Sequence, residues 1–389
     1  MNYSDFFKMI PEASLVAILI VLFVADFATA KAEERKWFNP LASILLLLNT
    51  FVCLYPMDTQ HLFGDMYVTS SAVNVMKAIL SMGTFIVVVQ SRTWAAKTGK
   101  EAEFYMLIVS TLLGMFAMMS AGNFVMFFLG LEMASVPLAC AVAFDMYRKN
   151  SAEAAAKFIL TATFSSGVML YGISFLYGQF GTLYFEDIAV KMQATPLTVI
   201  GLVFFFSGLG FKISLVPFHF WTADTYQGAP TTVTGYLSVI SKGAAAFTLL
   251  SILFHVFGGM MEYWHVLLMI VVVLSITIAN LFAVRQNELK RFMAFSSISQ
   301  AGYIMLAAIG NNWANSVAAL SYYVLIYVVA NMAVFTIISV VEQNNGGKTD
   351  ISDYNGFYQT NPRLSFLMTL AMFSLGGIPP FAGMFSKFF

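Results

Sequence analysis

Charged side chains are scarce in this sequence: Asp, Glu, Lys and Arg make up 10% of its 389 residues, against about 25% in a soluble domain. Hydrophobic residues make up 59%, which leaves too little polar surface to cover a water-soluble globule. The formal net charge is zero, so no basic face is available for nucleic acid. The chain has two cysteines and four scattered histidines, without a CxxC motif. The sequence therefore indicates no metal or iron–sulfur site, and we expect no cofactor in this chain.

Long apolar runs take the place of the missing polar surface. An apolar stretch of about 20 residues is long enough to cross the hydrocarbon core of a membrane as a helix. We count about twelve such stretches by that length rule and predict an all-α integral membrane protein. They lie near residues 12–30, 39–56, 71–90, 104–121, 123–145, 155–179, 197–220, 231–257, 263–284, 291–310, 314–341 and 363–389.

Lys and Arg residues gather in alternate loops, whereas the loops of the other parity hold only Lys191. Loops rich in Lys and Arg stay on the cytoplasmic side of a membrane. We therefore predict a multi-pass protein surrounded by the lipid bilayer, with these loops on the cytoplasmic side (or the matrix or stromal side in an organelle) and its N-terminus on the outer side. The thirteen residues that decide this are Lys31, Arg35, Lys36, Arg92, Lys97, Lys100, Arg148, Lys149, Arg285, Lys290, Arg291, Lys348 and Arg363.

Several ionisable residues lie inside the predicted spans. A charge at the bilayer centre costs about 2.5–3.5 kcal/mol, so such residues persist only where they face protein or water, and they usually mark ion or proton paths. Two other interpretations are open: a lysine near a helix end can extend its ammonium group to the interface, or a buried pair can be purely structural. The residues are Lys77, Lys157, Lys212, Lys242, Lys387, Glu132 and Asp26.

Three of these residues lie deep in their spans. Glu132 is near the middle of the fifth predicted helix, too far from either end to reach the interface. Lys212 lies five residues before Pro217, which lacks a backbone donor and disturbs the helix. A broken helix with an ionisable residue beside the break is a recurrent feature of transporters. Lys242 is also well inside its span.

Two lysines lie closer to helix ends. Lys157 is near the cytoplasmic end of the sixth predicted helix, where extension to the interface and a functional role are both open. Lys77 is a short way into the third predicted helix, so extension to the interface is favoured there.

A glutamate and a lysine buried together can move a proton. Desolvation favours the neutral amine, and a nearby carboxylate favours the ammonium. A Glu–Lys pair whose separation changes can therefore take up and release a proton. The sequence leaves open whether Glu132 and Lys212 touch.

Two proline breaks suggest an inverted repeat. The helix around Lys212 and the last predicted helix, with Pro379, Pro380 and then Lys387, occupy corresponding places in two sets of helices that begin on opposite sides. This arrangement is typical of inverted five-helix repeats. We divide the chain into N-terminal helices (1–100), a first repeat (101–260) and a second repeat (261–389). A second repeat of five helices needs one more after the last, so we expect the native chain to continue beyond Phe389.

Four motifs resemble one protein family. They are KISLVPFHFW at 212–221, DTYQGAPT at 224–231, KRFMAFSSISQAGY at 290–303 and GGIPPFAG at 376–383. The first and last resemble the broken seventh and twelfth helices of the antiporter-like, proton-translocating membrane subunits of respiratory NADH:quinone oxidoreductase (complex I). The segment GYLSVISK at 235–242 is similar to the N-type members, whose bacterial forms have fourteen helices.

The resemblance implies roles for individual residues. Glu132 would be the helix-5 glutamate and Lys212 the helix-7 lysine paired with it, while Lys242 and Lys387 would continue a lateral proton path; Lys157 joins them as a candidate. Electron transfer from NADH through FMN and iron–sulfur clusters to quinone would occur in partner subunits. The other partners implied are membrane-arm subunits, including paralogous antiporter-like ones, and the resemblance to bacterial members implies a bacterial inner membrane.

Two competing interpretations remain open on the residues alone. The first is a subunit of a multi-subunit sodium/proton antiporter or a membrane-bound hydrogenase. Sodium exchange calls for a site rich in oxygen ligands, and only Glu132 is deep and acidic. The second is a scaffold in which the buried charges merely set helix packing.

Overall fold

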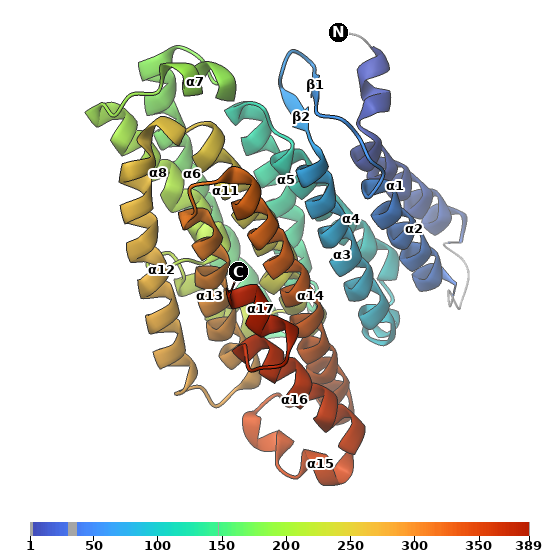
Figure 1. Cartoon of the computed structure of the whole chain (residues 1–389). Helices are drawn as coiled ribbons and strands as arrows, with labels where there is room; N and C mark the ends of the chain where they lie inside the picture. Colours follow the sequence, from blue (N-terminus) through green and yellow to red (C-terminus); the bar gives the residue numbers. More distant parts are fainter. Residues whose placement is uncertain (1–2, 30–36, 147, 389) are drawn as a thin grey trace.

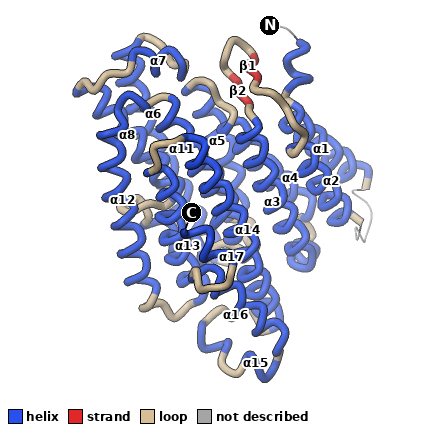
Figure 2. Tube along the Cα trace, viewed as in Figure 1, coloured by secondary structure: helices blue, strands red, loops and turns tan. Residues whose placement is uncertain are grey.

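The structure is a computed structural model that describes residues 3–29, 37–146 and 148–388. Most of its helices run side by side as a bundle (Figure 1). In this part of the chain the only strands form a short hairpin at the end of the bundle where the N-terminus lies (Figure 2). The group Lys31, Arg35 and Lys36, used to predict orientation, falls outside the described residues.

Ten helices in the described residues are long and apolar enough to cross a membrane. Each of the twelve predicted spans coincides with a helix, which confirms the all-α membrane fold. The ten are α1 Ile10–Ala28, α3 Ser71–Thr98, α4 Glu101–Met119, α5 Phe124–Val142, α6 Lys149–Phe180, α8 Pro196–Ile213, the continuous run Thr231–His255 (α10 Thr231–Tyr236, η2 Leu237–Ser241, α11 Lys242–His255), the run Gly258–Ala283 (η3 Gly258–Met260, α12 Met261–Ala283), the run Leu289–Ile309 (α13 Leu289–Leu306, η4 Ala307–Ile309) and α14 Trp313–Asn344.

The other two predicted spans are a shorter helix, α2, and a helix in two pieces. The pieces, α16 and α17, are separated by five residues that contain both prolines of the last motif. The short helix η1 precedes α1, three more short helices (α7, η5 and α15) lie in the connections, and α9 follows α8. The bounds are α2 Phe38–Cys53, α16 Pro362–Gly376, α17 Ala382–Phe388, η1 Tyr3–Lys8, α7 Phe185–Lys191, α9 Phe220–Gly228, η5 Ile351–Tyr354 and α15 Phe357–Thr360.

Both predicted helix breaks are confirmed. α8 ends at Ile213 and α9 begins at Phe220, with Pro217 in between. Each break opens with a left-handed residue, Ser214 at φ 68° and Gly377 at φ 78°. A left-handed residue ends a helix, and proline lacks the backbone donor that would continue it. The relation between the two halves as inverted repeats stays a prediction.

The run Thr231–His255 forms the centre of the bundle and is almost entirely buried. Its residues Leu237–Ser241 form one turn of π-helix directly before Lys242, a feature that the sequence did not reveal. Peripheral helices expose large apolar side chains instead, such as Phe27 on α1 and Phe164 on α6. This apolar exterior is the surface that a bilayer covers.

Two helices, α4 and α5, approach each other closely at glycines. A Cβ atom added to Gly130 would lie 2.8 Å from the Cα of Met118, and one added to Gly114 would lie 2.6 Å from the backbone carbon of Met133. Small residues at such crossings let helix backbones come together in membranes. The contact holds the middle of α5, which carries Glu132, against α4.

The hairpin pairs β1 (Gln60–Leu62) with β2 (Tyr67–Thr69) in antiparallel register. Its second strand also bonds to the turn between α4 and α5: the Val68 amide donates to the Ser120 carbonyl at 2.8 Å, and the Gly122 amide donates to the Met66 carbonyl at 2.9 Å. The hairpin is thereby attached to the residues that start α5.

Candidate functional site

Glu132, Ser135 and Lys212 meet between α5 and α8. Glu132 and Ser135 are three residues apart and so share one face of α5. The Lys212 ammonium is buried and donates to the Ser135 hydroxyl at 2.7 Å. The direct partner of Lys212 is thus a serine, and the half-buried Glu132 carboxylate lies beside the pair.

A small cavity connects the three side chains. It has a volume of about 20 Å³ and is lined by Glu132, Ser135 and Lys212 together with Ser165 and Ser166 of α6. A water molecule needs roughly 10–15 Å³ and two to four polar partners. The cavity, which Glu132 and Lys212 both line, therefore has room for one water molecule.

Lys242 is buried at the start of α11. Its ammonium donates to the Ser297 hydroxyl of α13 at 2.8 Å, and Ser297 is 3.3 Å from the Tyr226 hydroxyl of α9. The ammonium also lies 5.4 Å from the centre of the Tyr226 ring. Like Lys212, it donates to a serine hydroxyl, and no carboxylate in the described residues is within 4.0 Å of it.

Lys387 of α17 is half-buried against the second helix break. Its ammonium donates to the carbonyl oxygen of Leu375 at 2.7 Å and to that of Gly376 at 3.3 Å. The Gln300 side chain of α13 donates to the same Leu375 oxygen at 2.9 Å. Since Ser297 and Gln300 lie on one face of α13, this helix connects the surroundings of Lys242 with those of Lys387.

Lys157 lies apart from these buried lysines. It is exposed and pairs with Glu153 at 2.8 Å and with Asp224 of α9 at 2.7 Å. Arg291 of α13 contacts the other oxygen of Asp224 at 2.8 Å. α9 is outside the ten spans, and hydrogen bonds from Lys157 and Arg291 hold the pKa of Asp224 below its usual 3.8. The structure thus places Lys157 in a surface network of ion pairs.

We expect Asp224→Asn to lower the thermal stability of the protein at pH 7 by less than about 1 kcal/mol, because the pairs are largely solvent-screened. A lowered folded-state pKa stabilises the fold above the unfolded value of 3.8, and this contribution is lost as pH falls through the folded pKa. The difference in Tm between variant and wild type should therefore vanish in acid. The exposed Asp58→Asn is the control, and a Tm gap for Asp224→Asn that persists unchanged into acid would contradict the prediction.

Sequence reasoning did not predict that Lys77 and Lys290 are buried. Lys77 was expected to extend to the interface, but its side chain is 0% exposed and pairs with Glu12 of α1 at 2.6 Å. Lys290 was assigned to a loop, but it lies in α13, buried, with its ammonium 2.7 Å from the Ala229 carbonyl oxygen. The partners come from distant parts of the chain, so no local signal indicated them.

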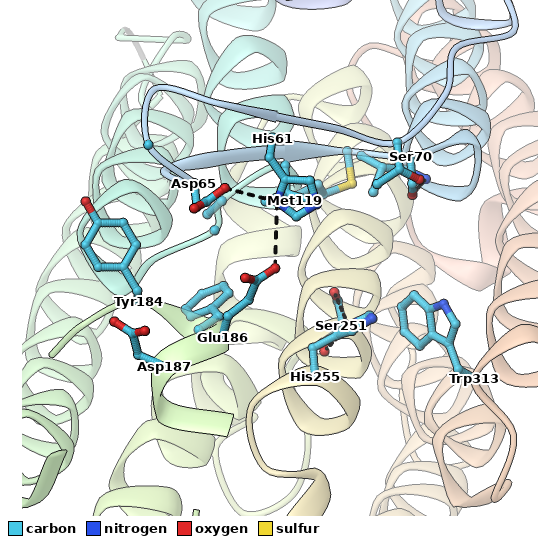
Figure 3. Close-up of a pocket in the computed structure, with 17 residues that line it drawn as sticks. His61, Asp65, Ser70, Met119, Tyr184, Glu186, Asp187, Ser251, His255 and Trp313 are labelled. Carbon is cyan, nitrogen blue, oxygen red and sulfur yellow. Dashed lines mark hydrogen bonds and ion pairs between the residues drawn. The ribbon is translucent and has the colours of Figure 1, made fainter. Parts of the chain in front are cut away.

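A larger cavity, of about 580 Å³, opens beside the hairpin and α7. His61 Nδ1 of the hairpin lies 3.2 Å from Asp65 and 3.7 Å from Glu186 of α7 (Figure 3). His255, at the end of α11, lines the same space. None of the predicted site residues lines it, so it is separate from the buried lysines.

Comparison with known proteins identifies the family of this chain. The family described as "NADH:quinone oxidoreductase/Mrp antiporter, TM" matches residues 121–389. The chain is 58% identical over 392 residues to "NADH-quinone oxidoreductase subunit N" of Phocaeicola vulgatus, covering 100% of this chain and 82% of the relative. It is 48% identical over 395 residues to the protein of the same description in Azobacteroides pseudotrichonymphae, with the same coverage.

A solved structure has the same fold. It is a chain of "Respiratory complex I from Thermus thermophilus with bound Aureothin", with a TM-score of 0.81 and 28% identity, covering 97% of this chain and 81% of that one. The long curated matches and this structure agree with the family that the four sequence motifs resemble. The chain belongs to the NADH-quinone oxidoreductase subunit N family, within the wider NADH:quinone oxidoreductase/Mrp antiporter family.

Proposed function

We propose that this chain is a membrane-arm subunit of a bacterial NADH:quinone oxidoreductase and moves protons across the membrane. Its relatives in Phocaeicola vulgatus and Azobacteroides pseudotrichonymphae are described as "NADH-quinone oxidoreductase subunit N" and match over the full length of the chain. Electron transfer from NADH to quinone belongs, in this proposal, to partner subunits that hold FMN and iron–sulfur clusters. Paralogous antiporter-like subunits are further partners. The N-terminus and the hairpin face the outer side, as the Lys and Arg distribution predicts.

The arrangement of Lys212 is the observation that carries the proposal. A buried ammonium beside a carboxylate usually forms an ion pair, but Lys212 donates to Ser135, and Glu132 lies across a space for one water. This geometry suits proton exchange, because neither charge is locked in a direct pair. A proton on the Glu132 carboxyl can pass through the water to a neutral Lys212 amine, leaving a carboxylate beside an ammonium.

The helix break and α9 provide a route from Lys212 towards Lys242. The hydroxyls of Ser214, Thr222 and Thr225 and the Nδ1 atom of His219 are buried without a hydrogen-bond partner in the described residues. Buried polar atoms are nearly always hydrogen bonded, to ordered water where protein is not available. We therefore propose that water joins these groups into a path that ends at Tyr226.

From Lys242 the proposed path continues along α13. The Ser297 hydroxyl accepts from Lys242, and Gln300, one turn further on, shares the Leu375 carbonyl with Lys387. Tyr323 of α14 donates to the other end of the Gln300 amide. Lys157 and Asp224 lie at the predicted cytoplasmic surface. They line a cavity of about 160 Å³ there. We propose that protons enter the path from this cavity.

Co-purification tests the assignment to a redox-driven complex. The full-length protein, tagged and extracted in mild detergent, is expected to bring with it a large assembly that contains flavin and iron and reduces quinone with NADH. An untagged strain carried through the same purification is the control. Isolation of the protein alone, or with only hydrophobic subunits that exchange sodium for protons in vesicles, would overturn the proposal in favour of an autonomous antiporter.

A further inference from the structure

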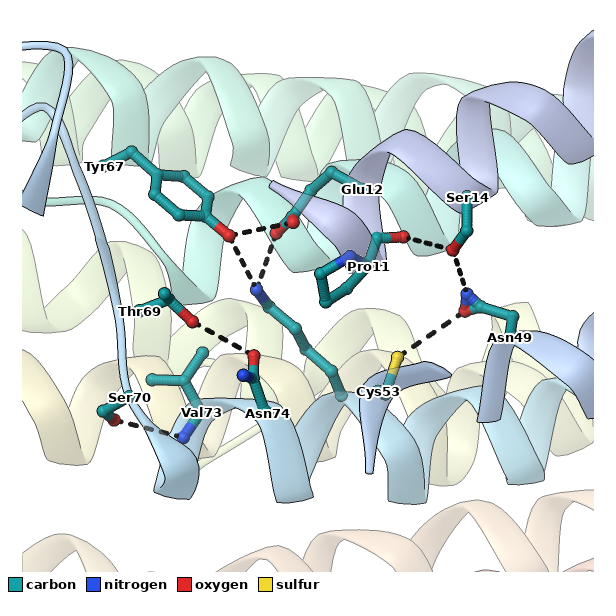
Figure 4. Close-up of polar contacts among 11 residues, drawn as sticks. Pro11, Glu12, Ser14, Asn49, Cys53, Tyr67, Thr69, Ser70, Val73 and Asn74 are labelled. Atoms are coloured by element: carbon teal, nitrogen blue, oxygen red, sulfur yellow. Dashed lines mark hydrogen bonds and ion pairs between the residues drawn. The ribbon is translucent and has the colours of Figure 1, made fainter. Parts of the chain in front are cut away.

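Three polar side chains form a buried cluster outside the proposed proton path (Figure 4). The Lys77 ammonium of α3 donates to Glu12 Oε1 of α1 at 2.6 Å. The Tyr67 hydroxyl of β2 donates to Glu12 Oε2 at 2.9 Å and lies 3.3 Å from the same ammonium. Each of the two carboxylate oxygens and the ammonium thus has a partner, and the three side chains come from three separate elements.

The cluster is sealed from its surroundings. The Lys77 side chain is 0% exposed and that of Glu12 is 6% exposed. The rings of Tyr67 and Phe116 of α4 lie over the ammonium, at 5.4 and 5.6 Å from their centres. A direct, enclosed and fully bonded pair differs from Glu132 and Lys212, which face each other across a cavity. The geometry therefore favours a fixed contact over a group that exchanges protons.

Tyr67 connects this cluster to the start of α5. The Tyr67 backbone forms an antiparallel β-bridge with Ala121 in the turn between α4 and α5. The neighbouring Val68 amide donates to the Ser120 carbonyl at 2.8 Å. Two residues later Asn123 caps α5, accepting from the Met126 amide at 2.8 Å. Any movement of the Tyr67 strand would therefore act on the first turn of α5.

We propose that Glu12, Lys77 and Tyr67 form a clamp that positions α5 and, through it, the Glu132 carboxylate relative to Lys212. They are positioning residues, since none of them touches the proposed path. The clamp joins the N-terminal helices to the helix pair α4–α5. Because α4 and α5 cross closely at Gly114 and Gly130, a shift at the start of α5 moves the rest of this helix as well. The link to proton transfer rests on the proposed function, whereas the link to α5 does not.

Hydrogen–deuterium exchange of the assembled complex tests the clamp directly. Removing one partner of a buried pair leaves an uncompensated charge and is strongly destabilising, so Lys77→Met is expected to speed amide exchange in residues 120–128 about tenfold or more. Tyr67→Phe keeps the ring and the ion pair and should give a smaller increase. Lys8→Met, which breaks the exposed pair with Asp5 at 3.7 Å, is the matched control and should change nothing.

The charge-swapped double variant Glu12→Lys with Lys77→Glu restores the pair and is expected to return exchange in residues 120–128 towards the wild-type rate. If Lys77→Met fails to assemble, Tyr67→Phe carries the test, because it removes only a hydroxyl. Unchanged exchange in residues 120–128 in the assembled variants would overturn the clamp.

Proton pumping provides the second measurement. The pH profile of the proton-to-electron ratio is expected to shift in Lys77→Met or Tyr67→Phe and to recover in the charge-swapped variant. A profile identical to wild type, together with faster exchange, would overturn the link from the clamp to Glu132. If Glu132→Gln itself pumps normally, the proposed function fails, and the exchange measurement still decides whether the clamp holds α5.

Discussion

Lys212→Met is expected to stop proton translocation through this subunit and to slow NADH:quinone turnover about 100-fold, the lower end of what a positioned acid–base group contributes. Methionine has a similar length but cannot bind a proton, so the exchange with Glu132 across the cavity is lost. The measurement is the ratio of protons moved to electrons transferred by the assembled complex in sealed vesicles. Lys191→Met, which removes an exposed lysine from α7, is the matched control and should leave the ratio unchanged.

A double variant separates a proton path from a structural pair. Glu132→Gln with Lys212→Met removes both charges, so no buried charge is left uncompensated. If the two residues only set helix packing, this variant should assemble and pump with the full proton-to-electron ratio. The proposed path predicts that it assembles and still fails to pump. A full ratio in the double variant would end the proton-path proposal.

The positions of the helices could be predicted from the sequence because their causes are local. A span is a run of apolar residues of sufficient length, and a break is a proline with small residues near it. For the same reason Pro217 and the pair Pro379–Pro380 indicated both breaks. The π-helix before Lys242 has no such local mark and was not predicted.

The partners of the buried lysines could not be predicted, because they depend on how each helix is rotated in the bundle. Lys212 donates to Ser135, which is 77 residues away in the chain. Glu132 and Ser135 lie on the same face of α5, so the spacing was compatible with either partner. Only the packing of α5, α6 and α8 places the small cavity beside the carboxylate.

Lys77 shows the limit of reasoning from depth alone. A lysine near a helix end normally extends its ammonium to the interface. Here the hairpin covers that end of α3, and Tyr67 and Glu12 supply bonds that replace water. Glu12 is 65 residues from Lys77, and the hairpin was not anticipated. Whether a polar group near a predicted helix end is exposed to solvent therefore depends on where the connecting segments lie, which the helix prediction does not give.

The second large effect is expected from Gly130→Leu in α5. A Cβ atom at this position would lie 2.8 Å from the Cα of Met118, and backbone atoms of a packed helix cannot turn aside as a flexible side chain can. Overpacking a well-packed site usually costs about 1–3 kcal/mol, and a leucine against backbone should exceed that range. We expect almost no assembled complex on native gels. Gly167→Leu in the neighbouring helix α6 is the matched control, since nothing lies within 4 Å of its added Cβ.

The smaller substitution Gly130→Ala connects this packing to function. It adds a single carbon, but that carbon would lie 2.5 Å from the backbone nitrogen of Met118, so α5 has to shift away from α4. Glu132 is two residues further along the same helix. We expect this variant to assemble with a lower Tm and a reduced proton-to-electron ratio, because the distance from Glu132 to Lys212 changes. Normal assembly, Tm and pumping in both Gly130 variants would show that the α4–α5 contact is looser than the glycines indicate. Reduced stability with a full ratio would instead show that proton transfer tolerates movement of α5, as several waters rather than one would allow.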